Sequence, residues 1–198
     1  MRKISILVII VLYFSQTFLF AYNAEPKEFV RELVNDVIIK LSDKNLGEDE
    51  KAKFVEKIAI ENVDINALGL YTLGELRKSS DKQTINNYQL AFKKYFLKSL
   101  TSRLTDYSAS KFEILELDKK SSNYTIVKSK IIPSDGSPKI KIDWRVYTKN
   151  LNKPLIRDLI VEGLSLARTQ KEEFASILNS NNNDINILII KLQEFVNN

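Results

Sequence analysis

The sequence contains no cysteine and no histidine among its 198 residues. Without histidine, the chain cannot form the serine–histidine–aspartate or cysteine–histidine arrangements that activate nucleophiles in many hydrolases. Zinc sites built from histidine and cysteine are excluded in the same way. The absence of cysteine also means that no disulfide supports the fold. A hydrophobic core must therefore supply the stability, and a chain of this length can form one.

The chain also has little net charge. The formal net charge is only +5, and basic and acidic residues are interleaved, as in the run Leu117-Asp118-Lys119-Lys120. A nucleic-acid-binding domain normally concentrates Lys and Arg on one element, so nucleic acid is not expected as a partner. The sequence contains no phosphate-binding loop, dinucleotide-binding fingerprint or cluster of metal ligands. We therefore expect no metal and no cofactor.

One long hydrophobic run is present, at the N-terminus. Arg2 and Lys3 precede an almost unbroken apolar run over residues 4–12. Ala21 and Ala24 both stand where a cleavage site would follow such a run. This order of a charged start, an apolar run and a small residue is typical of a signal peptide.

The sequence therefore predicts a signal peptide over residues 1–24 and a single domain over residues 25–198. An uncleaved membrane anchor is the alternative, because the run over residues 4–21 is about long enough to span a bilayer. In both cases the body of the protein lies outside the cytoplasm.

Several segments carry hydrophobic residues at steps of three and four, a spacing typical of amphipathic helices. Asp64 is expected to cap a short helix. In the longest segment the aromatic residues share one side and Lys93, Lys94 and Lys98 lie largely off it, which is typical of a core-facing stripe and a solvated face. Helices are predicted over residues 26–41, 48–59, 65–70, 80–104, 169–178 and 183–196.

Between these helices the apolar period changes to two, which predicts strands over residues 112–117, 124–132, 139–148 and 155–162. Short turns between the strands indicate an antiparallel meander, and apolar residues on both faces of the last strand place it inside the sheet. The order of elements predicts an α+β fold with helices packed on one face of a curved four-stranded antiparallel sheet. The pattern is compatible with a filled core or with a hydrophobic cavity between the layers.

Residues 163–167 superficially fit the G-x-S-x-[GA] nucleophile elbow of hydrolases. That motif needs a base and a parallel sheet, whereas this chain lacks histidine and its sheet is predicted to be antiparallel. Ser165 is instead expected to cap the helix that follows it.

Asp158 and Glu162 share one face of a strand at a separation of roughly 13 Å, because strands rise by about 3.3 Å per residue. This separation is too large for a pair of catalytic carboxylates that hydrolyse glycosides. Arg145 and Arg157 are expected to form ion pairs with these acids across the strands.

The stretch from Asp158 to Phe174 resembles the signature D-x-x-x-E-G-x-S-L-x-x-x-[YF]-[RK]-x-x-F of the MlaC (toluene-tolerance) family of periplasmic phospholipid carriers. Gln170-Lys171 stands where that family usually has a Tyr-Arg pair. The resemblance extends over nearly the whole chain after the predicted signal peptide. The matching signature residues are Asp158, Glu162, Gly163, Ser165, Leu166 and Phe174, and the further similar elements are residues 67–74, Phe92, Arg103-Leu104 and Tyr107.

The resemblance implies a monomeric periplasmic protein that carries phospholipid between the outer and inner membranes and so maintains the lipid asymmetry of the outer membrane. It implies a hydrophobic cavity between sheet and helices, no enzymatic reaction and no cofactor. The implied partners are an outer-membrane lipoprotein complex and an inner-membrane ABC transporter complex. Two acyl tails with about thirty CH₂ groups would cost on the order of 20 kcal/mol if left in water, so such a carrier must enclose them.

The side chains that we expect to contact the lipid tails are apolar and come from the predicted helices, from the predicted strands and from the turn that follows the last strand. They are Val34, Val37, Leu70, Leu73, Phe92, Phe96, Ile140, Ile142, Trp144, Val146, Leu159, Val161, Leu164 and Leu166. On the sheet, the opposite face is the alternative. Two other functions stay open: an enzyme of an α+β cone fold that acts on a small hydrophobic substrate through Asp and Arg, and an envelope adaptor with a filled core.

Overall fold

The computed structural model of the chain describes residues 22–104, 109–134 and 136–198. The predicted signal peptide falls almost entirely outside these residues, and so does Tyr107. Within the described residues the chain forms seven helices and five strands. In chain order they are α1 (Pro26–Ser42), α2 (Glu48–Asn62), α3 (Ile65–Thr72), α4 (Leu76–Ser79), α5 (Lys82–Leu104), β1 (Ala109–Ser121), β2 (Tyr124–Pro133), β3 (Ile140–Tyr147), β4 (Leu155–Val161), β5 (Leu164–Ser165), α6 (Leu166–Asn179) and α7 (Ile185–Asn197).

The predicted helices are all present, with two differences. The short helix α4 was not predicted, and α6 begins at Leu166 rather than at Thr169. The predicted cap of α3 is confirmed, because the Asp64 carboxylate accepts a hydrogen bond from the backbone N–H of Ala67 at 3.2 Å. This bond satisfies one of the backbone donors that the first turn of a helix leaves without a partner.

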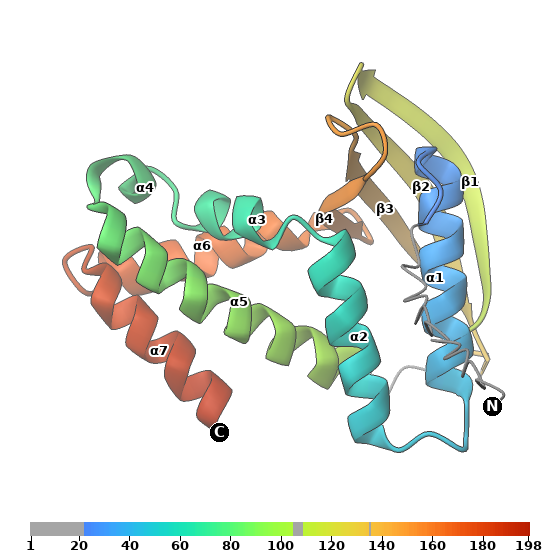
Figure 1. Ribbon diagram of the computed structural model, residues 1–198, viewed down its shortest axis with the longest axis horizontal. Coiled ribbons are helices and arrows are strands. Elements are labelled where there is room, and N and C mark those ends of the chain that lie inside the picture. The colour runs from blue at the N-terminus through green and yellow to red at the C-terminus, as the bar shows by residue number, and fades with distance from the viewer. Residues whose placement is uncertain (1–21, 105–108, 135) are drawn as a thin grey trace, which may run out of the picture.

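The sheet is an antiparallel meander in the order β1-β2-β3-β4-β5, and Figure 1 shows it curving around α1. The α+β class is therefore confirmed, but the prediction of four strands is wrong, since the two residues of β5 pair with the end of β4. Two residues are too few to produce a hydrophobic period. The position of β4 inside the sheet is confirmed, because β4 pairs with both β3 and β5.

One face of the sheet, which we call the inner face, points toward α1 and α2. Residues directly opposite each other on antiparallel strands point to the same side. Ile142 pairs with Ser129 and with Val161, and Val161 pairs with Leu164, so these four residues form one row across the inner face. The prediction that Ile140, Ile142, Trp144 and Val146 share one face is confirmed, and this is the inner face.

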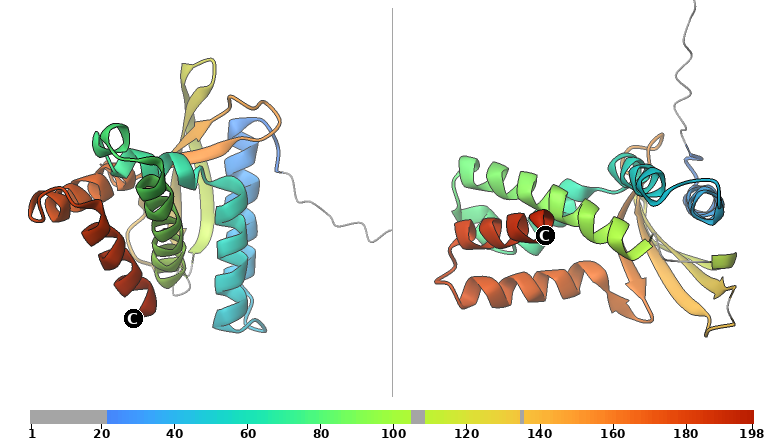
Figure 2. Two further views of the ribbon diagram at one scale, coloured as in Figure 1. Left: turned by 60° about the vertical axis from the view of Figure 1, so that its left-hand side comes forward. Right: turned by 90° about the horizontal axis from the view of Figure 1, so that it is seen from below.

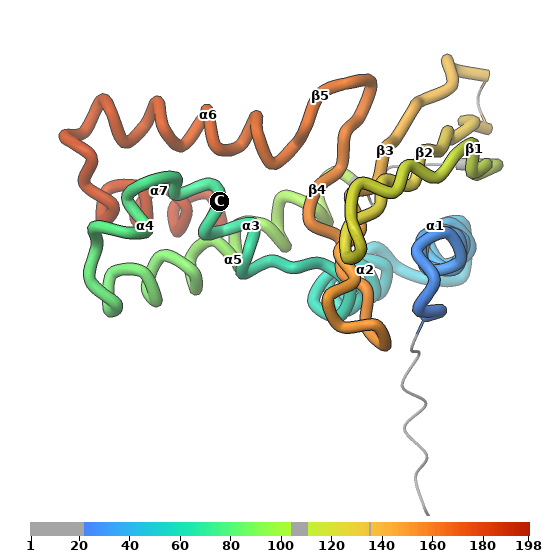
Figure 3. The backbone as a smooth tube through the Cα atoms, turned by 90° about the horizontal axis from the view of Figure 1, so that it is seen from above, coloured from blue at the N-terminus to red at the C-terminus, as the bar shows by residue number. Residues whose placement is uncertain are grey.

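Two hydrophobic cores hold the chain together. Helices α1 and α2 cover part of the inner face, whereas α3 to α7 lie beside the sheet as a second layer (Figures 2 and 3). Val63, between α2 and α3, packs against both cores. The inner core contains Phe29, Val30, Leu33, Val34, Ile58, Val127, Trp144, Val146 and Ile156. The helical core contains Ile65, Leu68, Leu73, Tyr88, Ala91, Phe92, Phe174, Leu178, Ile185, Leu188, Ile189 and Leu192.

The outer face of the sheet carries ion pairs, and one of them predicts a dependence of stability on pH. The Glu113 carboxylate accepts hydrogen bonds from the ammonium groups of Lys111 and Lys130, at 2.7 and 2.6 Å, and these bonds lower its pKa from 4.5 to about 2. Because the folded pKa is the lower one, the contribution of Glu113 to stability is present above pH 4.5 and is lost as the pH falls toward 2.

The variant Glu113→Gln should therefore unfold at lower urea concentration than the unchanged protein at neutral pH. The difference should disappear near pH 2, where the wild-type carboxyl group is itself becoming neutral. Urea unfolding curves recorded across this range provide the measurement. A difference that remained constant down to pH 2 would show that the ion pairs are not its cause.

Candidate functional site

The inner face is only partly covered by helices. Helix α1 packs on β1 and β2. On the same face Trp144, Val146 and Ile156 are buried in the inner core, whereas several other apolar residues of β3, β4 and β5 stay partly accessible. Ile140, Ile142, Leu159 and Val161 are half-buried, and Leu164 is 69% exposed. We call these five residues the apolar strip. Contiguous apolar side chains that solvent can reach are typical of a surface that binds a hydrophobic ligand or a partner.

The corner between β4 and β5 keeps the strip continuous. Val161 pairs with Leu164, so only Glu162 and Gly163 form the turn between the two strands. Both have positive φ, 49° and 85°, which is the backbone conformation of the tight two-residue hairpin turn. The turn folds the chain back at once, and Leu164 therefore lies beside Val161 on the inner face.

Gly163 suits this turn because of its backbone conformation and not because space is short. A Cβ atom added there would meet no atom within 4 Å. Any cost of replacing it therefore comes from the positive φ, which costs an ordinary residue about 1 kcal/mol. Gly163→Ala should lower the free energy of unfolding by about this amount in urea titrations. Gly47→Ser, at a helix N-cap where φ is −70°, should not lower it. Equal losses in both variants would contradict the role of the positive φ.

Asp158 fastens the same corner from the outer face of the sheet. Its buried carboxylate accepts hydrogen bonds from the Ser165 hydroxyl at 2.6 Å and from the backbone N–H of Ala167 at 3.0 Å. It also forms an ion pair with Arg145 at 3.2 Å, as predicted. Ser165 in turn accepts a hydrogen bond from the N–H of Arg168, which confirms it as the N-cap of α6. The spacing of Asp158 and Ser165 in the signature thus has a direct structural role: it ties β4 to the start of α6.

The other predicted ion pair is wrong. Arg157 does not pair with Asp158 or Glu162 but with Asp64, at 2.8 Å, and its guanidinium lies over the ring of Tyr147 at 3.4 Å from the centroid. A register shift in β4 next to Arg145 changes which side chains meet, and this shift is not visible in the apolar alternation. Glu162 instead accepts a hydrogen bond from the backbone N–H of Lys141.

Two hollows of about 410 and 240 Å³ lie among the described residues, and neither is lined by the apolar strip. The larger is at the turn between β3 and β4, beside Tyr147 and Leu155. The smaller lies between α3 and the outer face, where burial raises the pKa of the Tyr124 hydroxyl. The predicted hydrophobic cavity between sheet and helices is not one of these hollows, and it stays a prediction.

The residues predicted to contact lipid fall into four environments. Val34, Trp144 and Val146 are buried in the inner core, with Val37 packed against it, while Leu73 and Phe92 are buried in the helical core, with Phe96 packed against it. Leu70 is half-buried on α3, and Leu166 is exposed at the start of α6. The remaining five form the apolar strip. The structure thus brings five of the sheet and corner residues together in the strip and places most of the predicted helix residues, with Trp144 and Val146, in or against the cores. Lipid contact stays a prediction for all of them.

Phe112 and Ile114 on β1 also face inward and pack against the inner core, but they were not predicted as part of the site. A register shift between Ile114 and Glu116 interrupts the alternation there. The short alternation before the shift, Phe112-Glu113-Ile114, is the signal that could have identified them.

Comparison with known proteins adds three findings. The sequence profile of the family described as MlaC protein matches residues 31–194. A solved structure of a phospholipid-binding protein from Ralstonia solanacearum, in complex with a phospholipid, superposes with a TM-score of 0.72 at 18% identity and covers 88% of this chain and 97% of its own. At this identity the likeness establishes the fold. No curated protein matches the sequence. Within the part of the chain described by the structure, none of the helices has the length and apolar character needed to cross a bilayer.

Proposed function

The chain belongs to the MlaC protein family, and from this premise we propose that it binds a phospholipid through its acyl tails and carries it through the periplasm. The observation that carries the proposal is the apolar strip, a continuous row of aliphatic side chains on the inner face that the helices leave partly accessible. The Ralstonia protein, which shares the fold, supports it because that protein was solved with a phospholipid bound.

The physical demand on such a carrier matches the placement of the strip. Each CH₂ group transferred from water to an apolar surface contributes about 0.8 kcal/mol, so the tails drive binding and the polar headgroup can remain near water. The strip runs from β3 to the exposed edge at β5, and a tail lying along it would enter from that edge. Helices α5 and α6, which belong to the second layer beside the sheet, would have to cover the parts of the tail that the strip does not contact.

The proposed transport role is supported by the family and by the predicted signal peptide rather than by the site. We expect exchange of lipid with an outer-membrane lipoprotein complex and with an inner-membrane ABC transporter complex. The predicted signal peptide supports export from the cytoplasm, which is compatible with a place in the periplasm between these two complexes.

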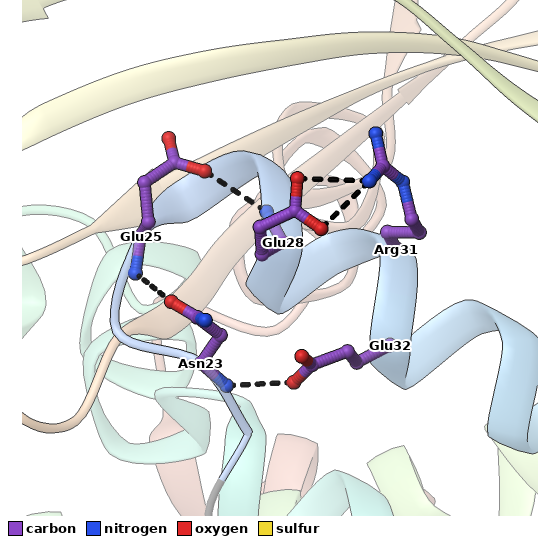
Figure 4. Close-up of polar contacts among 5 residues, drawn as sticks. All are labelled: Asn23, Glu25, Glu28, Arg31 and Glu32. Atoms are coloured by element: carbon purple, nitrogen blue, oxygen red, sulfur yellow. Dashed lines mark hydrogen bonds and ion pairs between the residues drawn. The ribbon is translucent and has the colours of Figure 1, made fainter.

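The contacts around Tyr22 favour signal cleavage after Ala21 over cleavage after Ala24. The Tyr22 hydroxyl donates a hydrogen bond to Asp36 at 3.0 Å, and its ring packs on Phe29. Asn23 bonds to Glu32 through its backbone N–H and accepts a bond from Glu25 (Figure 4). Cleavage after Ala24 would remove all of these contacts with α1. Mass spectrometry of the exported protein identifies the first residue.

Native mass spectrometry of the purified full-length chain, expressed with export, tests the binding proposal. A bound phospholipid should appear as an added mass that organic extraction removes. The extracted protein should then take up phospholipid from vesicles and melt at higher temperature once loaded, because a ligand that binds only the folded state stabilises it. Protein that carries no lipid and takes none from vesicles would overturn the proposal.

A further inference from the structure

Helix α5 differs from the rest of the chain in its charge. Over its range Lys82–Leu104 the sequence contains four lysines and one arginine but no aspartate or glutamate. Elsewhere the two signs are interleaved, and the chain as a whole has 30 basic and 25 acidic residues. Positive charge is therefore concentrated on this helix, although the net charge of the whole chain is low.

The lysines in the middle of α5 are accessible and uncompensated. Lys93, Lys94 and Lys98 are exposed, and no ion pair joins any of them to another residue that the structure describes. Several lysines on the sheet, by contrast, form ion pairs. Lys128 pairs with Glu116 at 3.0 Å, and Lys130 pairs with Glu113 at 2.6 Å. The ammonium groups of Lys93, Lys94 and Lys98 thus face solvent without a counter-charge among the described residues.

An apolar side chain stands among these lysines. Leu90 is 65% exposed, and it precedes Lys93 and Lys94 by three and four residues, so the three side chains are neighbours on the helix surface. Lys98 follows Lys94 by four residues and is therefore its neighbour on the helix surface. Figures 2 and 3 show α5 at the margin of the helical layer, with no other described element on its outer side. We call Leu90, Lys93, Lys94 and Lys98 the basic face of α5.

We propose that the basic face of α5 docks on an anionic phospholipid bilayer. Lysines next to an anionic membrane each strengthen binding about fivefold, so three of them strengthen it on the order of a hundredfold. Leu90 lies where it can enter the boundary between headgroups and acyl chains, as apolar residues of interfacial helices do. Docking by this face would bring a lipid carrier to the membrane with which it exchanges its ligand.

The composition of the face favours a bilayer over a nucleic acid or an acidic protein. Arginine is enriched where phosphates or carboxylates are recognised specifically, because its guanidinium group binds them in a bidentate way, and the face contains lysines only. An exposed leucine beside the lysines contributes nothing to binding a phosphate backbone but gains from contact with lipid.

Sedimentation of the full chain with vesicles tests the proposal. Vesicles containing phosphatidylglycerol should bind the protein and vesicles of phosphatidylcholine alone should not. The triple variant K93Q/K94Q/K98Q should bind phosphatidylglycerol vesicles on the order of a hundredfold more weakly. The matched control K44Q/K149Q/K153Q removes the same charge from exposed lysines in two loops and should bind as the unchanged protein does. Binding should fall as salt is raised, because salt screens exposed charges.

Leu90→Gln should reduce binding by a smaller factor that salt does not abolish, since this contact is apolar. Equal binding to both kinds of vesicle, or equal losses in the α5 and control variants, would overturn the proposal. So would an α5 variant that loses binding to single-stranded DNA or polyglutamate but not to vesicles. Native mass spectrometry of the α5 variant separates this inference from the proposed function, because its bound phospholipid should be unchanged.

Discussion

Asp158→Ala should lower the free energy of unfolding by about 3 kcal/mol, the largest loss that we expect from a polar substitution in this chain. The carboxylate is only 3% exposed, and its removal leaves the Ser165 hydroxyl, the Ala167 N–H and the Arg145 guanidinium without their shared acceptor. Breaking a fully buried pair costs about 3–5 kcal/mol. The lower end applies here because the side chain of Arg145 is 38% exposed.

Urea unfolding of Asp158→Ala and of Glu116→Ala measures this difference with a matched control. Glu116 also pairs with a cation on a neighbouring strand, Lys128, but its side chain is 61% exposed. An exposed pair of this kind contributes less than about 1 kcal/mol. If the two variants lost similar stability, Asp158 would not fasten the corner as the contacts indicate. A double-mutant cycle of Asp158→Ala with Arg145→Ala then isolates the ion pair from the two hydrogen bonds.

Leu164→Asp should weaken phospholipid uptake at least tenfold while leaving the protein folded. Leu164 is the exposed end of the apolar strip, so a carboxylate there costs little in the free protein. With a tail bound along the strip, the same carboxylate would lose part of its hydration without gaining a partner, and a loss of about 1.4 kcal/mol already corresponds to a tenfold change in affinity.

Leu151→Asp is the matched control for this variant. Leu151 is 74% exposed in the turn between β3 and β4, outside the strip, so the substitution makes the same change in charge and hydrophobicity at a similar exposure. Uptake of fluorescent phospholipid from vesicles by delipidated protein gives the readout. Undiminished uptake by Leu164→Asp, or the same loss in both variants, would remove the strip from the binding surface.

The corner between β4 and β5 contains features that the sequence predicts and features that it does not. Gly163 and the cap at Ser165 were predictable because they depend on a few adjacent residues. The strand β5 was not, because two residues carry no periodicity and only their pairing with Ile160 and Val161 makes them a strand. The same limit explains the start of α6, whose first turn is defined by the Ser165 cap.

The partner of Arg157 illustrates a second limit. Cross-strand pairing was the natural expectation for an arginine on a strand, yet the observed partner, Asp64, is 93 residues away in the chain. Asp64 reaches β4 because Val63 forms a parallel bridge with Ile156 and brings the start of α3 to the edge of the sheet. No local pattern in the sequence encodes that approach.

By itself, the sequence determined the helices other than α4, the long strands, the shared face of Ile140, Ile142, Trp144 and Val146, and the absence of histidine and cysteine chemistry. These properties depend on composition and on periods of two or about 3.6 residues, which neighbouring residues establish. Only the tertiary structure decided that there are two cores, that Val34 and Phe92 belong to different ones, and that the strip on β3 to β5 stays accessible. Coverage of a surface depends on contacts between elements far apart in the chain, and periodicity tells which side of an element is apolar without telling what packs against it.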